Sequence, residues 1–270
     1  MKKPYVVLIT GASSGIGLVT GKHLSACGFY VIGTSRTPNK FPNHSFPLVA
    51  MDVTDNASIE SAIHQIISDY SRIDILVNNA GMGMAGPLEE LEKEPFYKVF
   101  DTNLMGPIFV MQQVLKQMHK QHSGKIINVA SLAGDNGLPF RSVYSASKAA
   151  LMRVTESLRL ELRHTPIQCT TLSPGSIQTP IAANRFYSPL RDDSIYYNQY
   201  KNALSDMDAH VENGINPTKV AKKIEKIILK NKLKPHYSVG PIIEILSPVI
   251  KFLLPQRNYE NLLASFYNLK

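Results

Sequence analysis

A tyrosine and a lysine stand four residues apart in the segment Y-S-A-S-K, as Tyr144 and Lys148. The residues from Val143 onward predict a helix, and side chains at this spacing share one helix face. A tyrosine hydroxyl titrates near pKa ~10 in water, so it is a poor proton shuttle at neutral pH. A nearby ammonium favours the phenolate and lowers that pKa. The pair can therefore exchange protons, although the spacing alone also fits a surface tyrosine beside a solvated lysine.

A serine stands at the end of the strand that precedes this helix. Residues 125–130 form an apolar run that predicts a strand, and Ser131 follows it directly. A hydroxyl at the carboxyl end of a strand and a Tyr/Lys pair on the next helix can converge on one oxygen atom. Ser131, Tyr144 and Lys148 therefore form one candidate site, and other elements must position it.

A glycine-rich turn follows the first predicted strand, residues 5–9, and leads into a helical pattern that runs to about Cys27. Glycines let the backbone approach a pyrophosphate, and a helix N-terminus offers free N–H groups and the positive end of a dipole. The spacing is G-x-x-x-G-x-G. We therefore predict that a dinucleotide binds this turn, through Gly11, Ser13, Ser14, Gly15, Ile16 and Gly17.

The second predicted strand, residues 30–35, indicates which dinucleotide binds. An acidic residue near its end would accept hydrogen bonds from the adenosine ribose, but the chain has Ser35 followed by Arg36. An arginine can pair with a 2′-phosphate, so the sequence favours NADP(H) over NAD(H). Alternatively, Arg36 is an ordinary surface charge.

Two further strand ends carry polar or small residues. The third strand, residues 46–51, ends at Asp52 and Val53. The aspartate either hydrogen-bonds the adenine amino group or caps the helix that starts near Asn56. The fourth strand, residues 73–77, is followed by a turn that suits the neighbourhood of a cofactor, although its first residue can instead tie neighbouring strands together. That turn consists of Asn78, Asn79, Ala80 and Gly81.

Residues 89–119 predict one long helical region with Asn103 in its middle. Asparagine is disfavoured inside a helix, so it indicates a specific task there. No further histidine, cysteine or carboxylate is patterned near His119 and His122. We therefore expect both to be surface residues and not metal ligands. The remaining elements are a helix over residues 144–164, a strand over 167–172, a helix over 217–230 and a short strand over 236–239.

Two late segments differ from the rest of the chain. Residues 180–212 hold five aromatic side chains among polar residues, with little strand or long-helix signal. Such a segment is often a lid over a binding site. Residues 241–270 are unusually apolar and predict a pocket wall, a subunit contact or a membrane-surface anchor.

Composition limits the class of protein. The chain has 270 residues, a net charge of +8 and two cysteines. Its length is enough for one large core, and so few cysteines favour reduced thiols in the cytoplasm. No apolar stretch reaches a membrane span, and the short apolar run at the start resembles a buried strand more than a signal peptide. Seven lysines within residues 219–234 form a solvated helix face or attract an anionic membrane surface. No nucleic-acid motif accompanies them.

These motifs, in this order and spacing, resemble the short-chain dehydrogenase/reductase family over about residues 4–180. They are T-G-A-S-S-G-I-G, N-N-A-G, Asn103, Ser131, Y-S-A-S-K and P-G. Segments such as G-L-P-F-R-S-V-Y-S-A-S-K look like the branch of 17β-hydroxysteroid and retinol dehydrogenases. The resemblance implies one Rossmann-type domain over residues 1–270, a doubly wound parallel sheet of about seven strands with the first strand central.

The resemblance also implies roles for individual residues. Tyr144 would be the general acid in carbonyl reduction and the base in alcohol oxidation. Lys148 would lower the pKa of Tyr144 and bind the nicotinamide ribose, and Ser131 would orient the substrate oxygen. Asn103 would hold a water that resupplies protons. The nicotinamide end of the cofactor would contact Pro174, Gly175, Ile177 and Thr179.

We therefore predict an NADP(H)-dependent oxidoreductase that acts on a hydrophobic ketone, aldehyde or alcohol of steroid, retinoid or lipid type. Family members commonly form homodimers or homotetramers, and the same is expected here. The alternative is a non-catalytic NADP(H)-binding sensor or membrane-docked scaffold, which the lysine-rich helix and the apolar tail would suit.

Overall fold

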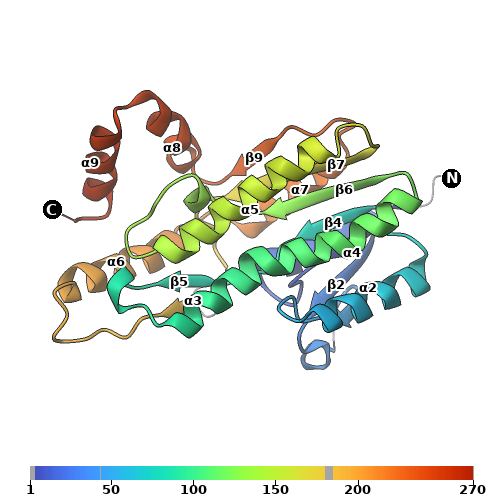
Figure 1. Ribbon diagram of the computed structural model, residues 1–270, viewed down its shortest axis with the longest axis horizontal. Helices are drawn as coiled ribbons and strands as arrows, with labels where there is room; N and C mark the ends of the chain where they lie inside the picture. Colours follow the sequence, from blue (N-terminus) through green and yellow to red (C-terminus); the bar gives the residue numbers. More distant parts are fainter. Residues whose placement is uncertain (1–3, 43, 180–184, 270) are drawn as a thin grey trace.

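Seven parallel strands form the central sheet of the computed structural model, which describes residues 4–42, 44–179 and 185–269 (Figure 1). Their order is β3-β2-β1-β4-β6-β7-β9. This confirms the predicted α/β class and the parallel sheet of about seven strands. The strands span Val6–Ile9 (β1), Tyr30–Ser35 (β2), Leu48–Ala50 (β3), Ile75–Asn78 (β4), Gly124–Val129 (β6), Ile167–Pro174 (β7) and His236–Val239 (β9).

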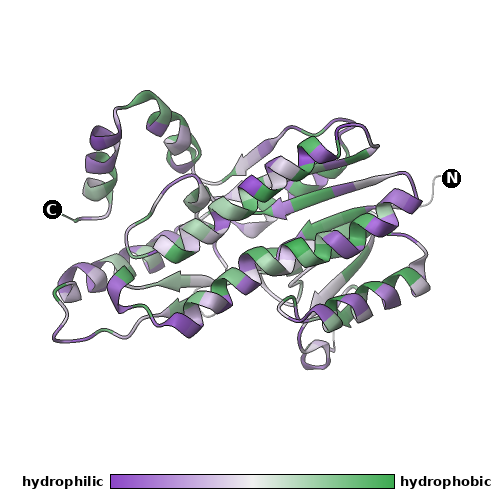
Figure 2. Ribbon diagram, viewed as in Figure 1, coloured by the Kyte–Doolittle hydropathy of each residue, from purple (hydrophilic) through white to green (hydrophobic). Residues whose placement is uncertain are grey.

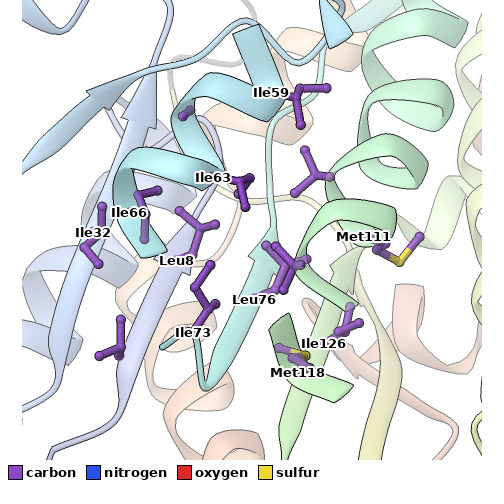
Figure 3. Close-up of a cluster of buried hydrophobic side chains, with 14 of the residues drawn as sticks. Leu8, Ile32, Ile59, Ile63, Ile66, Ile73, Leu76, Met111, Met118 and Ile126 are labelled. Atoms are coloured by element: carbon purple, nitrogen blue, oxygen red, sulfur yellow. The ribbon is translucent and has the colours of Figure 1, made fainter. Parts of the chain in front are cut away.

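Helices cover both faces of the sheet because successive side chains of a strand point to opposite faces. Val7 and Ile9 of β1 pack with α1 and α7, whereas Leu8 packs with α2, α4 and the end of α5. Figure 3 shows the second cluster, where isoleucines of α2 and methionines of α4 meet the aliphatic side chains of the sheet. These helices span Gly15–Ala26 (α1), Asn56–Tyr70 (α2), Gly106–Lys120 (α4), Ser142–Glu161 (α5) and Pro217–Ile228 (α7).

The strand order reverses at β1, which lies between β2 and β4. In open α/β sheets, ligands bind beyond the carboxyl ends of the strands at such a point. The turns that follow β1, β4 and β6 therefore meet at one edge of the sheet, and these turns carry the glycine-rich segment, N-N-A-G and Ser131.

The long helical region expected over residues 89–119 is confirmed from residue 93 onward, but it is divided into segments. A short turn at Leu88–Glu90 (η2) and helix Lys93–Phe100 (α3) lead into a π-helical turn, Asp101–Met105 (η3), before α4. Pro107 lies in the first turn of α4, where it lacks the N–H of a regular helix. A Cβ on Gly106 would lie 2.6 Å from the carbonyl oxygen of Val53. These constraints break the α-helical register next to Asn103.

The segment expected to have little helix also differs from its prediction. Residues 180–184 lie outside the described residues, but the rest contains strand Arg185–Tyr187 (β8) and the 16-residue helix Tyr197–Glu212 (α6). Strand β8 pairs with Gly83–Ala85 (β5) in a separate two-stranded sheet. The buried Tyr200 hydroxyl donates to the carbonyl oxygens of Ala85 and Ser188, at 2.9 and 3.1 Å. These tertiary contacts of Tyr200 stabilise α6, a helix that the polar residues around Tyr200 did not predict.

The apolar tail folds into two helices, Ile242–Leu253 (α8) and Gln256–Phe266 (α9), at one end of the molecule (Figure 1). Much of α8 is coloured as hydrophobic in Figure 2, and Ile242, Val249 and Phe252 are exposed. Its other side is tied to the loop after β6, where the buried Asn136 binds Ser247 of α8 and Tyr259 of α9, at 2.9 and 2.7 Å. Among the described residues, no helix has both the length and the apolar character that crossing a bilayer requires.

Candidate active site

A cavity of about 1300 Å³ opens at the carboxyl edge of the sheet. It exceeds the roughly 300–1,000 Å³ of typical small-molecule sites, which leaves room for a cofactor and a substrate together. Of the predicted site residues, Gly17 and Asn103 are not in its lining. The others line it: Gly11, Ser13, Ser14, Gly15, Ile16, Arg36, Asp52, Val53, Asn79, Ala80, Gly81, Ser131, Tyr144, Lys148, Pro174, Gly175, Ile177 and Thr179.

The glycine-rich turn has the shape that a phosphate cradle needs. Gly11 has φ +63°, and a Cβ on it would lie 2.9 Å from Cα of Ala80. A Cβ on Gly17 would lie 2.5 Å from the Gly11 carbonyl oxygen. Gly17 therefore packs against the turn itself and does not line the cavity. No side chain caps the first turn of α1, and no acidic residue lies there. The N–H groups of that turn are therefore available to an anion, which fits a dinucleotide pyrophosphate.

The end of β2 presents a cation to the same cavity. Arg36 is exposed there, and the preceding Ser35 is buried and accepts a hydrogen bond from the Thr37 backbone N–H at 3.3 Å. Asp52 accepts from the Thr54 N–H and hydroxyl, at 2.9 and 2.8 Å. The helix-cap alternative for Asp52 is wrong, because Asp55 caps α2 by accepting from the Ala57 N–H.

The two asparagines at the end of β4, Asn78 and Asn79, have different neighbours. Asn78 donates to the Asn128 side chain at 2.9 Å and ties β4 to β6, so its structural alternative is confirmed. Asn79 donates to the carbonyl oxygens of Thr10 and Gly11, at 3.0 and 3.2 Å. The turn after β4 is thereby fixed against the glycine-rich turn after β1.

Tyr144 and Lys148 meet inside the cavity wall, on the buried face of α5. The Lys148 ammonium donates to the Val129 carbonyl oxygen at 3.0 Å, which anchors it to β6. Burial acts to raise the pKa of Tyr144, but the charges of Lys148 and Arg141 and a hydrogen bond from Ser131 bring that pKa below its usual value. Burial lowers the pKa of Lys148, and the neighbouring Tyr144 opposes that shift. The Tyr144 hydroxyl can therefore lose its proton at a lower pH than a tyrosine in water does.

Asn103 lies behind this pair, fully buried in the π-helical turn. Its Oδ1 accepts from the Met82 N–H at 2.9 Å, and its Nδ2 donates to the Met82 carbonyl oxygen and the Ser147 hydroxyl, at 2.9 and 3.0 Å. A Cβ on Gly81 would lie 3.1 Å from Asn103 Oδ1 and 3.3 Å from Lys148 Nζ. Asn103 therefore holds Met82 in place, next to Gly81, beside which the Lys148 ammonium lies.

The structure adds residues to this site that the sequence motifs did not indicate. Arg141 places its guanidinium 4.7 Å from the centre of the Tyr144 ring, and Arg185 of β8 also lines the cavity. Glu244 of α8 accepts from the Ser176 N–H at 2.6 Å, beside Gly175. Arg141 stands three residues before Tyr144, so a search of the turn before α5 would have found it. Arg185 and Glu244 had no local signal, because distant elements bring them here.

The family model for short chain dehydrogenase matches residues 5–188. The 3-ketodihydrosphingosine reductase of Bacteroides thetaiotaomicron is 36% identical over 269 residues, covering 99% of this chain and all of that protein. A solved short-chain dehydrogenase from Streptomyces avermitilis superposes with a TM-score of 0.80 at 26% identity, covering 94% of each chain.

Two other solved structures of similar fold contain nicotinamide nucleotides. A closed serine dehydrogenase was solved with NADP+, with a TM-score of 0.75 at 24% identity over 88% of this chain and 95% of its own. A Burkholderia phymatum enzyme of the family was solved with NAD, with a TM-score of 0.79 at 24% identity over 96% of each chain. The model match and the full-length relative show that this chain belongs to the short-chain dehydrogenase family and is a nicotinamide-dependent oxidoreductase.

Proposed function

We propose that the protein interconverts a carbonyl and an alcohol on a hydrophobic substrate, with NADP(H) preferred over NAD(H). The observation that supports this most strongly is the meeting of Ser131, Tyr144 and Lys148 in one cavity with the uncapped glycine-rich turn. The exposed Arg36 at the end of β2 supports the preference for a 2′-phosphate.

Bound nicotinamide would supply the hydride to the carbonyl carbon, or accept it in the reverse direction. Tyr144 donates its hydroxyl proton to the substrate oxygen in reduction and takes it back in oxidation. Ser131 orients that oxygen, and Lys148 stabilises the phenolate and would bind the ribose. Asn103 Oδ1 and Lys148 Nζ both border Gly81, and we place the proton-relay water between them. Pro174, Gly175, Ile177 and Thr179 would flank the nicotinamide.

The far end of the cavity supports an apolar substrate. Its lining there includes Ile243, Ile250, Leu262, Leu263 and Phe266, from α8 and α9. His210 of α6 stacks on Phe266 of α9 with 5.1 Å between ring centres. The relative named as 3-ketodihydrosphingosine reductase supports a ketone substrate. We therefore favour a lipid-like ketone over a small polar one as the substrate. A steroid or retinoid substrate stays a prediction from the sequence.

The direct test uses purified protein, NADPH or NADH, and a panel of medium- and long-chain ketones and aldehydes. Oxidation of the reduced nucleotide is followed by its absorbance, and nucleotide binding is measured separately by fluorescence. We expect turnover with NADPH on long-chain carbonyls. Tight NADPH binding without turnover on the whole panel would instead favour the non-catalytic sensor or scaffold.

The pH dependence of alcohol oxidation provides a further prediction. Removing a positive charge destabilises the Tyr144 phenolate, so Arg141→Gln should move the pKa of Tyr144 upward. Oxidation requires the phenolate, so the rising limb of the rate profile should shift to higher pH and the rate at neutral pH should fall. A profile of kcat for the wild type and the variant checks this. An unchanged inflection would show that Arg141 does not act on Tyr144.

Three further predictions concern the surroundings of the site. We propose that residues 185–212, the described part of the predicted lid, close over the substrate. We also propose that residues 241–270 form a C-terminal extension of one domain, and that the protein forms homodimers or homotetramers.

The exposed face of α8 supports peripheral membrane contact. Sedimentation with anionic vesicles, comparing wild type with Phe252→Ser, tests that contact, because the exposed ring should contribute to binding. Equal sedimentation of both proteins would argue against it.

A further inference from the structure

Arg141 is a cation whose side chain makes no hydrogen bond or salt bridge within the described part of the chain. Its side chain is half-buried and lines the cavity, and its Nε is shielded from solvent without a hydrogen bond. Its guanidinium lies over the Tyr144 ring, 4.7 Å from the ring centre. A guanidinium carries five N–H donors, and buried donors are nearly always satisfied. Such a group beside the reacting tyrosine is suited to an anion that arrives with the substrate.

Arg185 supplies a second cation to the same part of the cavity. Its side chain is 3% exposed, and its ion pair is long, at 3.4 Å to an Asp208 carboxylate that is itself 53% exposed. A solvated carboxylate at that distance compensates a buried charge only weakly. Arg185 also acts electrostatically on Tyr144. Two arginines therefore approach the reaction centre from different elements, the N-cap of α5 and strand β8.

Opposing negative charge is scarce among the described residues near Tyr144. Glu244 is the acidic side chain that acts electrostatically on Arg141, and its Oε2 accepts a hydrogen bond from the Ser176 N–H at 2.6 Å. Lys148 adds a third positive charge and is itself anchored on the Val129 carbonyl oxygen. Three cations against one carboxylate leave the reactive end of the cavity with an excess of positive charge, whereas the walls from α8 and α9 beyond it are largely apolar.

We propose that Arg141 and Arg185 bind an anionic group of the substrate, a carboxylate or a phosphate, placed a few bonds from the carbonyl that reacts. This inference rests on the proposed function and specifies its substrate as an amphipathic oxo acid or oxo phosphate. The planar fork of an arginine matches either anion. The apolar remainder of the substrate extends towards α8 and α9.

The test compares 4-oxododecanoate with its methyl ester, which differ in the charge of one group. With the wild type and NADPH, we expect kcat/KM to be at least about tenfold higher for the acid, roughly the effect of one charge-assisted hydrogen bond. The difference should lie mainly in KM. A ketone of the same length with an ammonium in place of the carboxylate should be the poorest of the three. A 4-oxododecyl phosphate compared with its neutral alcohol distinguishes phosphate from carboxylate.

Arg141→Gln and Arg185→Gln should each reduce the acid-to-ester ratio towards one. Comparing the two substrates within each variant cancels any change in Tyr144 itself. Arg141→Lys should restore part of the ratio, because it keeps the charge but loses the fork. Arg163→Gln, at an exposed position beyond the other end of α5, should leave the ratio unchanged. A wild-type ratio near one, or variants that retain the full ratio, would overturn the anion site.

Binding separates this inference from the proposed function. If no carbonyl compound turns over, the proposed function fails, and the anion site is then decided by calorimetric titration with dodecanoate and methyl dodecanoate. Tighter, salt-sensitive binding of dodecanoate that Arg141→Gln weakens by about tenfold would support the site. Equal binding of both compounds would refute it. Turnover of neutral ketones without preference for the acid would refute the anion site alone.

Discussion

Tyr144→Phe should lower turnover by at least ~100-fold, the lower end for a positioned acid or base, while leaving NADPH binding nearly intact. The substitution removes one oxygen atom and keeps the buried ring over which the Arg141 guanidinium lies. The substrate oxygen then lacks its proton donor, whereas the glycine-rich turn is untouched. The loss should therefore appear in kcat, with little change in the dissociation constant of the nucleotide.

Steady-state kinetics and a fluorescence titration on the same preparation check this prediction. Tyr97→Phe is the matched control, since that tyrosine is exposed on α3, and its kinetics should equal the wild type. Turnover by Tyr144→Phe within a few-fold of the wild type would remove Tyr144 from the mechanism. Loss of nucleotide binding together with turnover would point instead to damaged folding, which thermal unfolding would reveal.

Arg36→Asp should reverse the nucleotide preference. The arginine lies at the end of β2 on the cavity lining, and its loss removes one charge-assisted interaction, worth about 1.5–3 kcal/mol. The new carboxylate repels a 2′-phosphate and can accept a hydrogen bond from a 2′-hydroxyl. We expect NADPH affinity to fall by about 100-fold or more, with NADH affinity unchanged or improved.

Parallel titrations with the two reduced nucleotides measure this change. Lys40→Asp is the control for general electrostatics, because Lys40 is an exposed cation nearby in sequence that does not line the cavity. Its effect on the NADPH-to-NADH ratio should be small. Equal weakening of both nucleotides by Arg36→Asp would show that Arg36 does not recognise the 2′-phosphate.

The predictable parts of this protein are those that local sequence determines. The spacing of Tyr144 and Lys148 suffices to place both on one face of α5, and the glycines after β1 suffice for the turn whose φ values they permit. Short apolar runs likewise indicated the seven strands of the main sheet. These features depend on residues within a few positions of one another.

The unpredicted parts depend on contacts between distant segments. Helix α6 is held by Tyr200 against Ala85, and nothing in its own polar sequence requires that contact. Arg185 reaches the reaction centre because β8 pairs with β5, and α8 reaches it through Asn136 and Ser247. Periodicity within one segment does not report such pairings, so the catalytic end of the cavity was foreseen better than the substrate end.

The π-helical turn at Asp101–Met105 has a consequence for how this gene can change. A π-helical turn is closed by i→i+5 hydrogen bonds, so it contains one residue more than an α-helical turn. An in-frame deletion of one codon there would restore a regular helix and rotate the preceding residues by about 100° relative to α4. Asn103 would then turn away from Met82 and Ser147, which it now holds. Apart from Asn103, this short segment should therefore accept substitutions more readily than any change in its length, and we expect a one-codon deletion to inactivate the protein without unfolding it.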